Sequence, residues 1–109
     1  MEKKKIDISS VTDEKMKPVY LIQSIYDIHY HFAEVEEKIL DQLIMNEKLL
    51  DMIDDINFAY IKDGLEPTDV IKKVGYLLNF HVYLDPNQEK DYIIFTNDNK
   101  DIVEVNVII

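Results

Sequence analysis

The C-terminal residues 102–109 have the sequence IVEVNVII. The valines of this run alternate with Glu104 and Asn106, and successive side chains of a β-strand point to opposite faces. The alternation therefore predicts a strand with one apolar, buried face and one polar face.

Two further strands are expected upstream of this run. In Phe80–Leu84 apolar residues alternate with a histidine and a tyrosine, and Tyr92–Thr96 is rich in aromatic and β-branched residues. Asp85-Pro86-Asn87 and Asn97–Lys100 separate the three runs, and Asp and Asn tolerate the backbone angles of turns. The sequence predicts a three-stranded antiparallel β-meander over about residues 79–109.

Helices are expected before the meander. Between Pro18, which suits the first position of a helix, and Tyr60 there is neither proline nor glycine. Apolar residues recur there every three or four positions, with a change of phase near Asn46, so we expect two long helices. Gly64 and Pro67 then end the second helix, and a third, short helix follows. The apolar positions that carry this periodicity are Ile22, Ile25, Ile28, Phe32, Val35, Ile39, Leu43, Leu49, Leu50, Ile53, Ile56, Val70, Ile71 and Val74.

Residues Tyr20–Phe32 also fit a strand. Aromatic and branched residues occupy alternate positions here as well as helical ones. We predict a helix, and the strand remains the alternative.

The length of 109 residues corresponds to one domain. The polar residues 1–17 are expected to form a flexible N-terminal arm. Residues 18–109 are expected to form a single α+β domain, helical over about 18–78 and β over about 79–109. The lysines at the N-terminus precede no apolar run of signal-peptide length, and no stretch is apolar enough to span a membrane, so a cytoplasmic location is predicted.

Composition excludes several kinds of chemistry. The chain has no cysteine, no arginine and only two glycines, which leaves no disulfide, thiolate site or glycine-rich phosphate loop. The serines at 9, 10 and 24 lie in no nucleophile motif. We therefore predict a protein that is not an enzyme and that needs no cofactor.

The charge is strongly negative. Twenty-two acids face 12 lysines, for a net charge of −10, and residues 19–66 hold eleven acids but three lysines. Direct binding of nucleic acid or of an anionic membrane needs basic side chains that this chain lacks. The expected partner is a protein with a basic surface.

The acids of the predicted helices are spaced to form a face. Residues three, four or seven apart lie on the same side of a helix, where like charges repel by a few tenths of a kcal/mol per pair. This acidic face could be an ordinary solvated surface or the site that binds a partner. Its members are Glu34, Glu37, Asp41, Glu47, Asp51, Asp54 and Asp55.

Three histidines offer a metal-binding alternative. His29 and His31 could chelate a metal on a strand, where positions i and i+2 share a face, but on a helix they diverge by about 200°. His81 would have to approach from the strand Phe80–Leu84. Since we predict a helix at His29, we expect no metal site.

Together these features predict a small, acidic, non-enzymatic inhibitor or regulator that binds a basic, nucleic-acid-binding surface of another protein. In size, acidity and absence of catalytic motifs the chain resembles the proteins with which phages and mobile elements block host enzymes, such as anti-CRISPR proteins, DNA mimics and immunity proteins. The alternatives are a structural protein that self-associates, for example as a homodimer through its long helices or last strand, and a small histidine-based metal-binding protein.

Overall fold

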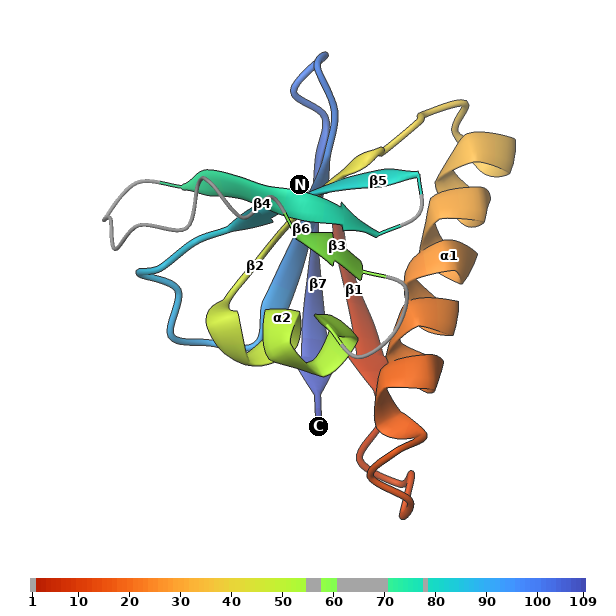
Figure 1. Cartoon of the computed structure of the whole chain (residues 1–109). Helices are drawn as coiled ribbons and strands as arrows, with labels where there is room; N and C mark the ends of the chain where they lie inside the picture. Colours follow the sequence, from red (N-terminus) through yellow and green to blue (C-terminus); the bar gives the residue numbers. More distant parts are fainter. Residues whose placement is uncertain (1, 55–57, 61–70, 78) are drawn as a thin grey trace.

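A mixed β-sheet and the helices packed on it make up the structure (Figure 1), a computed structural model that describes residues 2–54, 58–60, 71–77 and 79–109. The strand order across the sheet is β1-β7-β6-β2-β5-β4-β3. The pairs β1–β7 and β2–β5 are parallel, and the other neighbouring pairs are antiparallel. The elements in chain order are β1 (Glu2–Asp7), α1 (Lys17–Val35), β2 (Gln42–Met45), α2 (Glu47–Asp54), β3 (Phe58–Tyr60), β4 (Lys72–Leu77), β5 (Phe80–Leu84), β6 (Tyr92–Thr96) and β7 (Ile102–Ile108).

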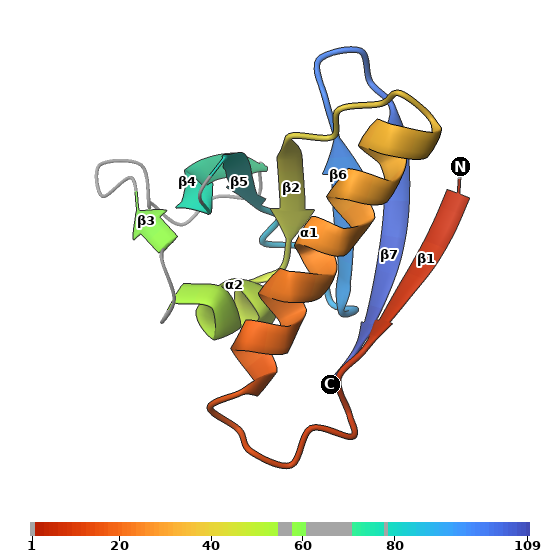
Figure 2. The same ribbon diagram turned by 90° about the vertical axis from the view of Figure 1, so that its right-hand side faces the viewer.

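Helix α1 lies across one face of the sheet, in front of β2 and β6 in Figure 2. Leu21, Ile25 and Phe32 are buried, because their spacing of four and seven residues places them on one side of the helix. Tyr20–Phe32 is therefore helical, as predicted. Fully burying a side chain such as Phe32 contributes about 1.5–3 kcal/mol to stability.

The end of α1 comes earlier than the periodicity predicts. The backbone N–H groups of Glu36 and Lys38 both donate to the carbonyl oxygen of Phe32, at 3.2 and 3.0 Å. Between them Glu37 adopts a left-handed conformation with φ of 55°. A left-handed residue just beyond the last turn is a common way for a helix to end, and it turns the chain back toward the sheet.

The prediction that the first helix continues to the change of phase near Asn46 is wrong. Gln42–Met45 forms β2, which pairs with β5 on one side and with β6 on the other. Leu43 and Met45 are buried in this position. Both residues have high helix propensity, but propensity is a weak preference that pairing on two sides overrides.

The prediction of a short third helix is also wrong where the structure can be compared with it. Lys72–Leu77 forms strand β4, antiparallel to β5, with a bulge between Lys73 and Gly75. A bulge adds a residue and shifts the alternation of side chains, so Val74 and Leu77 are both buried at a helical spacing. The second helix was expected to continue through Tyr60, which is wrong, because α2 ends at Asp54 and Phe58–Tyr60 forms strand β3, antiparallel to β4. The predicted helix end at Gly64 and Pro67 lies outside the described residues.

The class α+β is correct, but the predicted three-stranded meander after N-terminal helices is not. Strands β5, β6 and β7 lie where the sequence predicts strands, yet β2 is inserted between β5 and β6. Only β6 and β7 are both consecutive in sequence and adjacent in this part of the sheet. The segment expected as an arm contains β1, which pairs with β7 and contributes Ile6 to the core.

The core lies between the helices and one face of the sheet. Buried residues of α1 and α2 belong to the same cluster as the inward side chains of the strands, including Phe80, Phe95 and Val105. Alternate strand residues such as Ile44, Tyr83 and Ile94 point to the opposite face and are only partly buried.

Candidate functional site

The residues of the predicted acidic face do not lie on one helical surface. Glu34 is exposed near the end of α1, whereas Glu37 lies in the following loop and Asp41 precedes β2. The sequence stretch that was expected to carry them on one helix face is divided by the early end of α1. Of the others, Glu47 and Asp51 are exposed on α2, Asp54 is its last residue, and Asp55 lies outside the described residues.

Glu37 and Asp41 instead meet the turn between β6 and β7. Together with Asp98 and Asp101 they line a hollow of about 280 Å³, which we call the turn cluster. The Asn97 side chain joins the two segments, since its Nδ2 donates to the carbonyl oxygen of Ile39 and to Oδ2 of Asp101, both at 3.0 Å. Four carboxylates from two distant parts of the sequence thereby line one hollow.

Glu47 and Asp51 take part in a second group at the start of α2. With Asp85 and Glu89 from the β5–β6 connection they line a hollow of about 460 Å³, which we call the helix cluster. Asn46 also lines this hollow and is only 5% exposed. Its Oδ1 accepts a hydrogen bond from the N–H of Leu49 at 2.9 Å, which caps α2, and its Nδ2 donates to Oδ1 of Asp91 at 2.9 Å.

The two clusters lie at opposite ends of β2, because Asp41 precedes this strand and Glu47 follows it. Four strand residues span about 13 Å at about 3.3 Å per residue. Each hollow is lined by four carboxylates and one lysine, Lys38 in the turn cluster and Lys48 in the helix cluster. Lys48 also forms an ion pair with Asp91 at 3.3 Å, so its charge is shared with a further carboxylate.

The three histidines are dispersed. The ring of His29 packs at 5.1 Å from that of Phe80, whose side chain is in the core, and its Nδ1 lies 3.3 Å from the carbonyl oxygen of Leu40. His31 is exposed on α1, and His81, adjacent to Phe80 in β5, points to the other face of the sheet beside Tyr76. Among the residues that the structure describes, no three histidine or acidic side chains are grouped as a metal would require.

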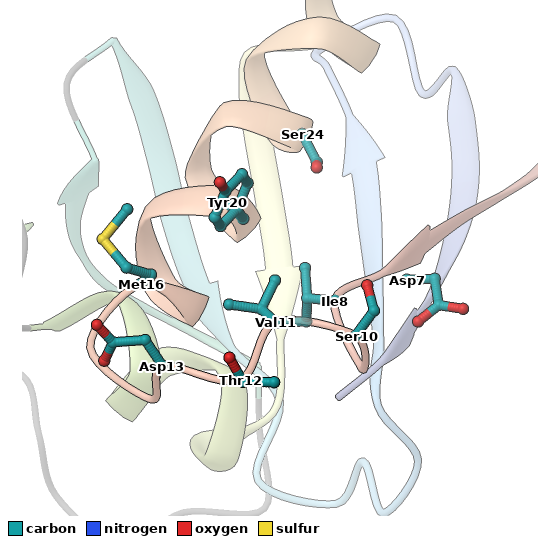
Figure 3. A pocket seen from close by; sticks show the side chains of 9 residues that line it. All are labelled: Asp7, Ile8, Ser10, Val11, Thr12, Asp13, Met16, Tyr20 and Ser24. Atoms are coloured by element: carbon teal, nitrogen blue, oxygen red, sulfur yellow. The ribbon is translucent and has the colours of Figure 1, made fainter.

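A pocket of about 520 Å³ lies between α1 and the loop that joins it to β1 (Figure 3). Tyr20 and Ser24 of α1 lie over the loop, which carries Ser10, Val11 and Thr12. The lining offers hydroxyl groups and the carboxylates of Asp7 and Asp13, but no histidine or lysine that could act as a base toward a hydroxyl. The pocket therefore offers hydroxyl and carboxylate groups that can bind polar ligands.

The carboxylates beside this pocket are engaged in local turns. Asp7 Oδ1 accepts hydrogen bonds from the hydroxyl and the N–H of Ser9, at 2.5 and 3.0 Å. The bond from the Ser9 hydroxyl is the main reason that the pKa of Asp7 is lowered from its ordinary value. Asp13 accepts a hydrogen bond from the N–H of Lys15 at 3.0 Å. These contacts order the loop.

Sequence reasoning missed both the contribution of the C-terminal acids to the clusters and the pocket. Most of the residues that line the pocket lie within residues 1–17, which were expected to form a flexible arm, so no pocket was predicted there.

Comparison with protein-family models, curated proteins and solved structures finds no match to this chain. No helix in the described ranges is long and apolar enough to cross a membrane.

Proposed function

We propose that this chain is a non-enzymatic inhibitor or regulator that binds a basic surface of a partner protein through the turn cluster and the helix cluster. The proposal keeps the partner class expected from the sequence, a cytoplasmic protein that itself binds nucleic acid. It replaces a single helical face by two acidic hollows.

The observation that carries the proposal is the gathering of carboxylates from separate parts of the chain. Glu37 and Asp41 are joined by Asp98 and Asp101, and Glu47 and Asp51 by Asp85 and Glu89. Assembling like charges costs free energy on the order of a few tenths of a kcal/mol for each exposed pair. A partner with lysine and arginine side chains relieves this repulsion on binding and is attracted over a distance set by the salt concentration.

The separation of the clusters supports a partner that binds nucleic acid. The ends of β2 are about 13 Å apart, and the phosphates of one DNA strand succeed one another by about 3.4 Å along the helix axis. The clusters at the two ends of β2 therefore present two separate groups of negative charge, to which a basic surface that binds successive phosphates is complementary.

The test compares the immobilised wild type with two variants that each lose three carboxylates, at different positions. The wild type is compared with a cluster variant, Glu37→Gln/Asp51→Asn/Glu89→Gln, and with a control variant, Glu14→Gln/Asp27→Asn/Glu34→Gln. All six side chains are exposed, and the two variants have the same net charge. Each protein is exposed to host lysate at low salt, and retained proteins are eluted with duplex DNA and then with salt.

The proposal predicts a DNA-binding protein that the wild type and the control variant retain, that DNA elutes, and that the cluster variant fails to hold. Its affinity for the purified chain should fall steeply with salt. Equal retention by the cluster and control variants would show that the position of the carboxylates is irrelevant. Retention of nothing that DNA can displace would equally overturn the proposal.

A further inference from the structure

Strand β1 is the last strand at one margin of the sheet (Figure 2). Successive residues of a strand direct their backbone N–H and C=O groups to alternate sides. The N–H of Ile8 donates to the carbonyl oxygen of Ile108 in β7 at 2.8 Å, so every second residue back from Ile8 faces β7. The backbone groups of Lys3, Lys5 and Asp7 therefore face away from the sheet, and no described strand pairs with them. An edge of this kind is a template for a further strand.

This edge differs in charge from the rest of the chain. Positions 3–5 hold the only run of three lysines in the sequence. Lys4 and Lys5 pair with uncharged residues of β7, whereas Lys3 pairs with Glu104. Lys5 is exposed, and it forms no ion pair with any residue that the structure describes. The edge is therefore a positive segment in a chain whose net charge is −10.

A pocket continues the edge beyond the end of β1. Asp7, the last residue of the strand, also lines the pocket of Figure 3, together with Met16 and Tyr20. Met16 is 39% exposed and Tyr20 46% exposed, so apolar surface is accessible there. A segment that pairs along β1 reaches this pocket at Asp7, and covering its apolar side chains adds to the stability of the contact.

We propose that the free edge of β1 binds an extended, acidic segment of a partner protein as an added strand. In strand addition the backbone hydrogen bonds supply affinity, and the side chains supply specificity. Acidic side chains of the segment complement the lysines of β1. A second copy of β1 is a poor occupant, because it would bring three lysines beside three lysines, and like charges on neighbouring strands are destabilising.

This inference goes beyond the proposed function and does not depend on it. None of the residues that line the turn cluster and the helix cluster belongs to β1. The two surfaces also select opposite charges, since the clusters attract basic groups and the edge of β1 attracts acidic ones. Failure of either proposal leaves the other intact.

Fluorescence anisotropy tests the inference with a labelled heptapeptide in which glutamate and valine alternate. The purified chain is titrated from about 1 µM to about 1 mM, a range that covers weak dissociation constants. The buffer contains about 0.15 M NaCl, where charges more than about 8 Å apart are largely screened, so the lysines at the edge outweigh the net charge of the chain. We expect the acidic peptide to bind, and a heptapeptide of alternating lysine and valine to bind at least about tenfold more weakly.

Two protein variants test the position of the charges. Lys4→Glu/Lys5→Glu should raise the dissociation constant of the acidic peptide about tenfold, because it replaces two attractions by two repulsions. Lys90→Glu/Lys100→Glu makes the same change of net charge at two exposed positions outside β1 and should leave the dissociation constant unchanged. Circular dichroism verifies that both variants are folded. Absence of binding to the wild type, or equal weakening by the two variants, would overturn the proposal.

Two further probes of the wild type distinguish an added strand from attraction of any polyanion. The acidic heptapeptide with every backbone nitrogen methylated keeps its charges but donates no hydrogen bond, and it should not bind. Oligothymidylate, which carries phosphates and no peptide backbone, should not bind either. If either probe binds as tightly as the acidic peptide, the proposal is wrong. These two probes need no variant, so they decide the question even where Lys4→Glu/Lys5→Glu does not fold.

Discussion

Replacement of Asn46 tests the link between the helix cluster and the stability of the fold. In the structure one end of this side chain caps α2 through Leu49, and the other end donates to Asp91. Loss of an N-cap costs about 1 kcal/mol. Loss of a hydrogen bond to a charged group costs about 1.5–3 kcal/mol.

Asn46→Ala should therefore lower the free energy of unfolding by about 3 kcal/mol. For a chain near 100 residues, 1 kcal/mol corresponds to about 4 °C in melting temperature, so Tm should fall by about 12 °C. Asn46→Asp keeps an oxygen for the cap but brings a second carboxylate to Asp91. Like charges raise the pKa of such a pair, so this variant should be least stable at neutral pH and should recover relative to the wild type as the pH falls.

Urea denaturation followed by circular dichroism measures these differences at several pH values. The matched double variant, Asn46→Asp/Asp91→Asn, exchanges donor and acceptor and should regain most of the loss. It forgoes the exposed ion pair with Lys48, which is worth about 0–1 kcal/mol, and the hydrogen bond of 3.3 Å from Asn46 Nδ2 to the carbonyl oxygen of Lys90. A double variant no more stable than Asn46→Asp would refute the reasoning, because the hydrogen bond at 2.9 Å would then not be the source of the effect.

Substitutions at two further positions test the packing and the C-terminal end of α1. Burial, with a smaller contribution from Tyr30, raises the pKa of Tyr26 above its ordinary value of 10.0, so the folded state is favoured while the hydroxyl is neutral and loses stability as the pH rises beyond about 10. Tyr26→Phe should reduce this loss of stability, measured by urea titrations from about pH 8 to pH 11. An identical pH dependence in the wild type and the variant would contradict the prediction. Glu37→Gly should raise the free energy of unfolding by up to about 1 kcal/mol, because glycine adopts φ of 55° without strain, whereas Glu37→Val should lower it. Thermal melts of both variants verify the sign, and a lower Tm for the glycine variant would contradict it.

The parts of the fold that the sequence predicts are those with a strong local pattern. Phe80–Leu84 and Ile102–Ile108 alternate clearly and were predicted as strands, and the apolar side of α1 predicted its helical conformation but not its end at Val35. The residues that end α1 and form β2 have no such signal. Glutamate is an unusual residue for a left-handed position, and Leu43 and Met45 fit a helix until β5 and β6 are present to pair with them.

The acidic clusters could be predicted only in part, since they depend on contacts between distant residues. Glu37 and Asp41 were expected to bind a partner, but Asp98 and Asp101 were assigned to a turn. The hydrogen bond from Asn97 to Ile39, across 58 positions of the sequence, brings the two groups together. A local pattern of charges contains no information about such a contact.

The pairing of β1 with β7 has a consequence for the synthesis of the chain. Glu2 pairs with Val103 and Asp7 with Ile108, so nearly the whole of the described chain is made between the two strands. On the ribosome β1 has no partner until residues 102–108 emerge, and closing so distant a contact is slow. Three consecutive lysines, at positions 3–5, keep this waiting strand charged and discourage it from pairing with other nascent chains.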